Sequence, residues 1–296
     1  MLEYRYLEAL AAVVEQEGFE RAGDYLHITQ SAVTQRIRQL EELAGQILLI
    51  RSQPPVPTEA GLLLLEHFRK VRVLEQEFEA RSSLTASKQK PVITLAVNAD
   101  SLATWFSAVV GRYFSLARGN LDIKSADQDV THEMMVDGIA MGCISSISTA
   151  FRGCRKNLLG NMVYRFVSTR SFAERYFSDG VDEKSYNEAP KLNFNKDDQL
   201  LENWAGQFFK NCNSYENSHF MPSSELFPVM VRKGSVCGML PDEQFNEFKE
   251  DYDLVDLSMD KPVSTPLYWH RWSIPSEELD IITEIIMEEA KKALIM

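Results

Sequence analysis

The sequence predicts an α+β chain with three parts: an N-terminal winged helix-turn-helix, a long helix and a C-terminal α/β half. Two short amphipathic segments meet at His27 and Ile28, as in a helix-turn-helix. The apolar residues of 59–81 recur every seven positions, which favours one long helix with a partner. From Pro91 onward, short apolar runs alternate with helical periodicity, which is typical of an α/β fold. With 296 residues and 45% hydrophobic content, the chain can hold two or three compact domains.

The second segment of the helix-turn-helix begins at Thr29, a good N-cap residue. Its apolar positions share one side of a helix: Val33, Ile37, Leu40 and Ala44. Side chains that can donate to base edges and phosphates occupy or flank the opposite side: Thr29, Gln30, Ser31, Thr34, Gln35, Arg36 and Arg38. No carboxylate lies between Thr29 and Gln39. This side is either a DNA reader or an ordinary solvated helix face.

The surroundings of this helix favour the DNA reader. A preceding amphipathic helix ends at Gly18, so three short helices fit into about fifty residues, as the motif requires. The apolar run Ile47 to Ile50, then Arg51 and the Pro-rich SQPPVPT, predicts a β-hairpin wing. We expect Arg51 to lie along the phosphate backbone.

Composition limits the other function classes. The net charge of −12 is unusual for a nucleic-acid binder, but phosphate binding depends on local basic groups, so an acidic domain can be joined to a locally basic head. Because the head is only weakly basic, tight binding should need a dimer or tetramer. The four cysteines show no metal-ligand spacing, so we expect neither a disulfide framework nor a metal site, and no cofactor. No signal peptide or membrane span is visible, so the sequence predicts a soluble cytoplasmic protein without membrane contact.

The long helix is expected from Thr58, its cap, to about Arg81. Three apolar residues recur every seven positions, with Leu74 between them and Phe68 alongside, and the five form the candidate dimerisation seam: Leu64, Phe68, Val71, Leu74 and Phe78. Such a seam indicates a partner helix, and the alternative is packing on the chain's own domain. The polar stretch from Ser82 to Lys90 is the expected hinge.

The C-terminal half is predicted to be a largely parallel, covered sheet. The expected strands are 92–97, 121–124, 141–144, 162–167, 191–194 and 236–240, and the expected helices include 101–116, 223–232 and 277–294.

The first eighty residues resemble the LysR-type transcriptional regulators. The matching residues are Phe19, Ala22, Leu26, the run Thr29 to Thr34, Ile37, Leu40, Glu41, Leu43, Gly45, Leu48, Arg51, Pro57, Thr58 and Gly61. The chain departs from the family at Leu49, usually Phe, and at Glu20, where Ser or Thr commonly caps the second helix. The segments 95–105, 223–225 and 268–271 resemble the ArgP group of that family, which responds to lysine and arginine.

This resemblance implies a domain plan. It gives a DNA-binding domain at 1–58, a linker helix and hinge at 59–90, and an effector-binding domain at 91–296. The last part resembles a periplasmic binding protein, with subdomain I at 91–145 and 267–296, subdomain II at 146–266, and a ligand cleft between them. The implied partners are double-stranded DNA, lysine or arginine as effector, further copies of the chain, and RNA polymerase.

The candidate effector site begins where the first strand of the α/β half ends, at Asn98, Asp100 and Ser101. Asp100, Asp127 and Glu225 are candidate counter-charges for a basic amino acid; alternatively, Asp100 is only an N-cap and the other two are solvated surface. The second subdomain would supply the facing wall from Phe194, Asn195, Ser223 and Ser224. Trp269 and His270 are expected to be packing residues, and no metal is assigned.

An enzyme is not expected, because the sequence has no nucleophile elbow, phosphate loop, dinucleotide motif or HExxH. The remaining alternative is an architectural or replication-initiation-inhibiting DNA-binding protein that senses no metabolite.

Overall fold

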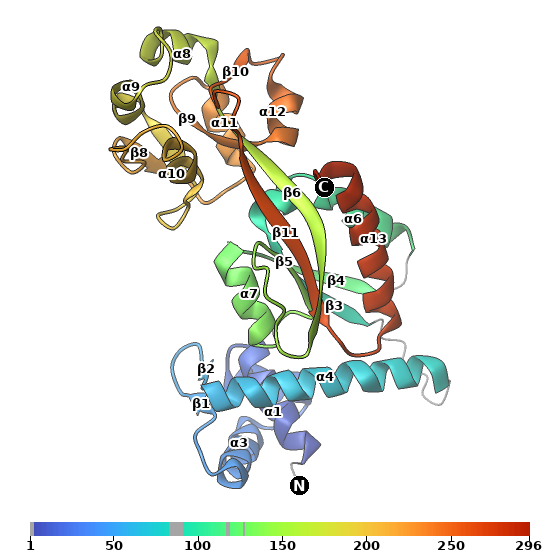
Figure 1. Cartoon of the computed structure of the whole chain (residues 1–296). Helices are drawn as coiled ribbons and strands as arrows, with labels where there is room; N and C mark the ends of the chain where they lie inside the picture. The colour runs from blue at the N-terminus through green and yellow to red at the C-terminus, as the bar shows by residue number, and fades with distance from the viewer. Residues whose placement is uncertain (1–2, 83–90, 117–118, 127) are drawn as a thin grey trace.

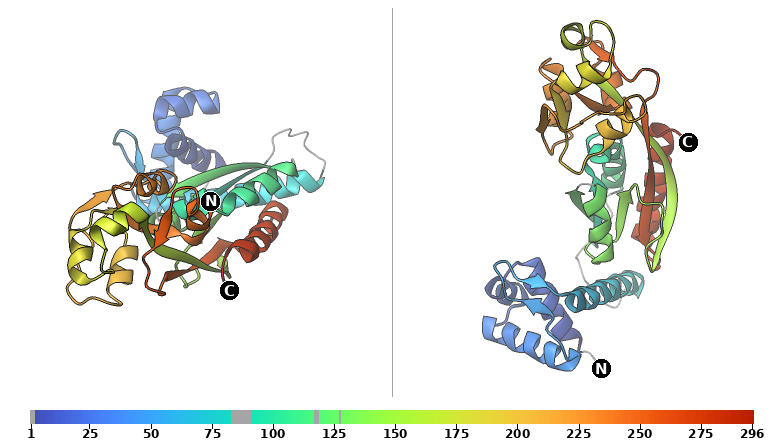
Figure 2. Two further views of the ribbon diagram at one scale, coloured as in Figure 1. Left: turned by 90° about the horizontal axis from the view of Figure 1, so that it is seen from above. Right: turned by 60° about the vertical axis from the view of Figure 1, so that its left-hand side comes forward.

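The computed structural model describes residues 3–82, 91–116, 119–126 and 128–296. Three parts follow one another along the molecule: a small helical head, the long helix α4, and an α/β part built on a nine-stranded sheet (Figure 1). Figure 2 shows α4 lying between the head and the α/β part. The predicted α+β fold class with these three parts is confirmed. None of the helices in the described ranges is long and apolar enough to cross a membrane.

The head consists of α1 (Tyr4–Glu15), α2 (Phe19–Leu26), α3 (Gln30–Ala44), β1 (Leu49–Ile50) and β2 (Val56–Pro57). Thr29 caps α3 as predicted, since its hydroxyl accepts a hydrogen bond from the Ala32 amide at 3.2 Å. α2 ends at Leu26, and the next residue, His27, has a left-handed backbone with a φ of 55°. The following turn packs closely on α2 because Gly23 has no side chain. A Cβ there would lie 2.8 Å from the carbonyl oxygen of Ile28.

The wing forms where the sequence places it. β1 and β2 pair antiparallel, and the exposed Arg51 follows β1. Thr58 caps the next helix by accepting a hydrogen bond from the Gly61 amide at 3.2 Å. The first helix is shorter than expected: α1 ends at Glu15, and Gly18 is the N-cap of α2.

The long helix α4 (Glu59–Ser82) changes its neighbours along its length. Phe68 is 2% exposed in the core of the head, and Leu64 packs against the same core. These two residues therefore pack on the chain's own head domain and not on a partner helix. Leu74 and Phe78 are 42% and 63% exposed, and Val71 is half-buried. The seam therefore begins inside the head and continues on the surface. The expected hinge at 83–90 lies outside the described residues.

The α/β part has two halves, which share β6 (Cys154–Thr169) and β11 (Val263–Trp272). The first half contains β3 (Val92–Asn98), α5 (Ala99–Ala103), α6 (Phe106–Ser115), β4 (Asn120–Ala126), α7 (Gln128–Val136), β5 (Gly142–Ser145) and α13 (Glu277–Ala293). The second half contains α8 (Arg170–Tyr176), α9 (Glu183–Glu188), β7 (Lys191–Asn193), α10 (Leu200–Ala205), β8 (Ser218–Phe220), α11 (Leu226–Arg232), β9 (Cys237–Pro241), α12 (Asp242–Phe248) and β10 (Leu254–Asp256).

The sheet is mixed, with strand order β4-β3-β5-β11-β6-β9-β7-β8 and β10 paired to β6. β3, β4 and β5 are parallel, and so are β7, β8 and β9. β6 and β11 are antiparallel to each other and to their other neighbours. The prediction of a largely parallel sheet is therefore wrong at its centre. The sequence pattern shows only 162–167 of the 16-residue β6.

The chain passes between the halves inside long strands. The beginning of β6 pairs with the end of β11 beside β5, whereas Tyr164 to Val167 pair with β9. The domain plan that the family resemblance implies has this crossing near Ser145 and the return near Pro266. The return position falls inside β11, and the division of the chain into domains at the stated residues stays a prediction.

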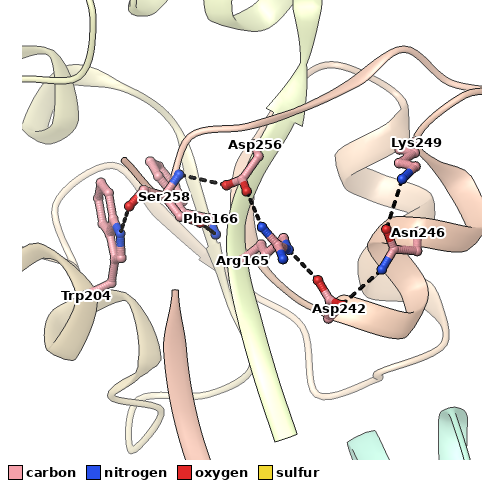
Figure 3. A network of polar contacts seen from close by, with 8 residues as sticks. All are labelled: Arg165, Phe166, Trp204, Asp242, Asn246, Lys249, Asp256 and Ser258. Carbon is pink, nitrogen blue, oxygen red and sulfur yellow. Dashed lines mark hydrogen bonds and ion pairs between the residues drawn. The ribbon is translucent and has the colours of Figure 1, made fainter. Parts of the chain in front are cut away.

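A polar network fastens the second half to β6 (Figure 3). Arg165 on β6 bonds to Asp242, the first residue of α12, and to Asp256 at the end of β10 at 2.6 Å. The Asp256 carboxylate also accepts from the Ser258 amide, and the Ser258 hydroxyl accepts from the Phe166 amide, both at 2.8 Å. Because α12 and β10 are held to the same strand, we expect the second half to move as one body with its end of β6.

Candidate functional site

The head presents the predicted polar side of α3 and the wing on one face. Among the candidates on α3 and its cap, Thr29, Gln30, Ser31, Gln35 and Arg38 are exposed, and Thr34 and Arg36 are half-buried. A hollow of about 630 Å³ lies between the start of α2, the start of α3 and the wing, and Gln30, Thr34 and Arg51 line it together. The Arg51 guanidinium lies 5.9 Å from the centre of the Phe19 ring, a cation–π contact that holds it beside this hollow.

A second hollow, the cleft, lies between the two halves of the α/β part and has a volume of about 340 Å³. The first half contributes the residues at the ends of β3 and β5, the second half contributes the loop before α10 and that helix, and β11 contributes one residue. The lining is Asn98, Ala99, Asp100, Ser146, Phe194, Asp197, Asp198, Gln199, Leu200, Asn203 and Thr265. Of the predicted effector residues, the structure brings Asn98, Asp100 and Phe194 together here.

Asp100 joins the two halves across the cleft. Its carboxylate accepts a hydrogen bond from the Tyr164 hydroxyl at 2.7 Å and one from the Ser224 hydroxyl at 2.5 Å. Burial, and after it the charge of Asp100, raise the pKa of Tyr164 well above its ordinary value. The hydroxyl therefore stays protonated and keeps donating to Asp100. Ser224, predicted for the facing wall, reaches the site through this carboxylate.

Asn98 is the least satisfied polar side chain of the cleft. It is 1% exposed, and neither its amide oxygen nor its amide nitrogen has a hydrogen-bond partner among the described residues. An unpaired buried polar group costs about 1–3 kcal/mol. A ligand with both a donor and an acceptor would recover that cost. Ser101 is also fully buried, and its hydroxyl lacks a partner within the described ranges, but it does not line the cleft.

Two carboxylates that sequence reasoning missed, Asp197 and Asp198, complete the cleft. Asp198 is held in place because its carboxylate accepts from the amides of Phe194 and Leu200, both at 3.0 Å. Asn195, a predicted ligand contact, instead accepts from the amides of Asp197 and Asp198 at 2.8 Å and shapes their turn. The adjacent acids in the sequence NFNKDD were the available signal.

The remaining candidates lie elsewhere. Glu225 is exposed at the start of α11 and does not line the cleft, and Ser223 accepts from the Leu226 amide at 3.3 Å. Asp127 lies outside the described residues. His270 is a buried packing residue, as predicted, whose Nε2 donates to the Ile147 carbonyl at 3.0 Å. The described residues contain no group of three or more side chains that could hold a metal ion.

Comparison with known proteins agrees with this layout. Residues 4–62 match the model of the bacterial regulatory helix-turn-helix proteins of the lysR family. The HTH-type transcriptional regulator ArgP of Pseudomonas fluorescens is 38% identical, and the alignment covers 100% of this chain and 99% of that protein. ArgP of Salmonella dublin is 37% identical over 99% of this chain and 98% of the relative.

Two solved structures share the whole fold. ArgP from Mycobacterium tuberculosis is 36% identical with a TM-score of 0.88, and the match covers 100% of this chain and 99% of that one. LysG from Corynebacterium glutamicum with bound effector Arg is 29% identical with a TM-score of 0.79, and both chains are covered completely. The chain therefore belongs to the LysR family of bacterial helix-turn-helix transcriptional regulators, within the ArgP group.

Proposed function

We propose that this regulator senses a basic amino acid, lysine or arginine, in the cleft between the halves of its α/β part. The observation that carries the proposal is the convergence of Asp100, Asp197 and Asp198 with the unpaired amide of Asn98 in one hollow. Carboxylates favour a cationic side chain, and an amide can meet both the ammonium and the carboxylate of an amino acid. The volume of about 340 Å³ falls within the range of small-molecule sites.

The relatives support the same ligand class. The LysG structure is described with bound effector Arg, and that chain matches this one from end to end. Asn98 and Ser101 are both predicted effector residues at the end of β3. Because Asn98 lines the cleft and Ser101 does not, we assign the amino-acid backbone to Asn98.

The proposed mechanism couples the cleft to the heads. A ligand shifts a conformational equilibrium only by binding one arrangement better than the other, and a cation among three carboxylates favours the closed cleft. Closure turns the α/β parts of an oligomer relative to each other and changes the spacing of heads that read half-sites about 34 Å apart. A cytoplasmic location and contact with RNA polymerase belong to this proposal.

A screen of the purified full chain with the twenty amino acids tests the ligand class. Lysine, arginine or both should raise the melting temperature, because a ligand that binds only the folded state stabilises it. Calorimetric titration should then give binding for the same amino acids. The absence of any shift with lysine and arginine would reject the proposal. Ligand binding that leaves DNA affinity unchanged would favour the architectural DNA-binding protein.

The reading side of α3 is tested with duplexes selected by the full chain from a random-sequence pool. Gln30→Ala and Thr34→Ala should each weaken the selected sequence by about 1–3 kcal/mol if the side chain contacts a base. Gln46→Ala, an exposed glutamine just after α3, is the matched control and should change nothing. Arg51→Ala should weaken all sequences alike and reduce the salt dependence. Unchanged affinity in both α3 variants would place base reading elsewhere.

A further inference from the structure

The later part of α4, from Val73 onward, lies against the first half of the chain's own α/β part. Val73 is 6% exposed and packs in one cluster with Met135, Ala140, Cys143 and Trp272, among others. Farther along the helix, the Glu77 carboxylate accepts a hydrogen bond at 2.7 Å from the amide at the start of α13. These contacts join the linker helix to a specific surface.

Gly138 allows the close approach of α4 to the end of α7. Its backbone is left-handed with a φ of 66°, and a Cβ at this position would lie 2.8 Å from the Cα and Cβ of Glu66 on α4. A side chain at residue 138 is therefore excluded both by its own backbone conformation and by the helix opposite. At this junction the backbone of residue 138 therefore packs directly against α4.

Arg69 connects three parts of the molecule at this junction. Its guanidinium donates to the Gly138 carbonyl at 3.3 Å and pairs with the Glu15 carboxylate of α1 at 3.5 Å. The Arg69 side chain is 14% exposed, so solvent screens these contacts only partly. A single side chain on α4 thus bridges the head and the α/β part.

α7 leads from this bridge to the cleft. The carboxyl ends of β3 and β5 contribute Asn98 and Ser146 to the cleft, and β4 is parallel to β3, so α7 begins at the same edge of the sheet. Nine residues of helix extend over about 14 Å and return α7 to the opposite edge. Figure 1 shows its lower end above α4. α7 therefore extends from the edge of the sheet where the cleft lies to the carbonyl that Arg69 holds.

We propose that Arg69 is a positioning residue that transmits the state of the cleft, through α7 and Gly138, to α1 of the reading head. The dependence of this transmission on a bound amino acid rests on the proposed function. A displacement of α7 moves the Gly138 carbonyl, and the guanidinium can follow it only by pulling on Glu15 or by giving up one partner. The orientation of α1, and with it α3, then depends on the cleft.

Hydrogen exchange of the full chain, with and without lysine or arginine, tests the proposal, and calorimetry on each variant measures ligand binding. In the wild type, ligand should alter exchange in the cleft segments and in α1. Arg69→Ala should keep the change at the cleft and lose the change in α1. Glu15→Gln, which removes the charge that pairs with Arg69 in the head and leaves the bond to Gly138, should do the same. Arg72→Ala removes an arginine of the same helix that stacks at 5.8 Å on Phe68, and it should retain both changes.

Retention of the α1 change in Arg69→Ala would overturn the proposal, and so would a bound ligand that leaves α1 of the wild type unaffected. If neither amino acid binds the wild type, the proposed function fails, and the ligand-free comparison decides on the bridge. Without ligand, Arg69→Ala should raise hydrogen exchange in α1 and in residues 139–140, which directly follow the Gly138 carbonyl that Arg69 holds. An unchanged rate in either segment would exclude Arg69 as the connection.

Discussion

Asp100→Asn is expected to weaken the binding of lysine or arginine by about 10- to 150-fold, which corresponds to the 1.5–3 kcal/mol of a charge-assisted hydrogen bond. The substitution removes the charge that faces the cation and weakens the acceptor that Tyr164 and Ser224 share across the cleft. Neutral amino acids should lose little. DNA affinity measured without ligand should stay nearly unchanged, because the carboxylate is remote from the head. Calorimetric titration with lysine, arginine and leucine gives the result.

Glu225→Gln is the matched control for this experiment. Like Asp100→Asn, it removes one negative charge from the α/β part, but Glu225 is exposed at the start of α11 and outside the cleft lining. It should therefore leave the affinity for basic amino acids unchanged. Equal loss in both variants would indicate a general electrostatic effect, and no loss in Asp100→Asn would remove that residue from the site.

Charging the exposed part of the α4 seam should separate the oligomer. Leu74 and Phe78 are large apolar side chains that the single chain leaves 42% and 63% exposed on one side of the long helix. If a partner helix covers them, Leu74→Glu or Phe78→Glu buries an unpaired charge, which costs several kcal/mol. Sedimentation should then show a smaller species, and cooperative binding to DNA should disappear.

Leu158→Glu is the comparison for this pair, since Leu158 is 46% exposed on β6, in the α/β part. It should leave the oligomer intact. A normal sedimentation coefficient for both α4 variants, together with normal DNA binding, would assign the assembly to another surface.

The head was predictable because its signals are local. The Thr29 cap, the apolar spacing of α3 and the Pro-rich wing act within a few residues of one another, and each appears where expected. Phe68 shows the limit of that reasoning. An apolar seam on a helix does not say which neighbour each side chain contacts, and Phe68 packs in the core of the head.

The cleft was only partly predictable because it forms between distant segments. Asp100 was found from its place at the end of a strand, whereas Asp198 reaches the same hollow through a loop whose position depends on the second half. Asn195 and Glu225 have suitable chemistry in the sequence. The fold uses the first to hold a turn and leaves the second on the surface, and no local pattern distinguishes these outcomes.

The place of β11 also bears on how the chain is made. This late strand inserts between β5 and β6, pairing Trp269 with Ile144, so the sheet lacks the strand that joins β5 to β6 until synthesis is almost complete. The head has no such requirement, since its core is drawn from residues up to Phe68. On the ribosome the head should fold early, while the edge of β5 stays unpaired until β11 has been synthesised. A message truncated after α12 should therefore yield a folded DNA-binding head joined to an aggregation-prone remainder.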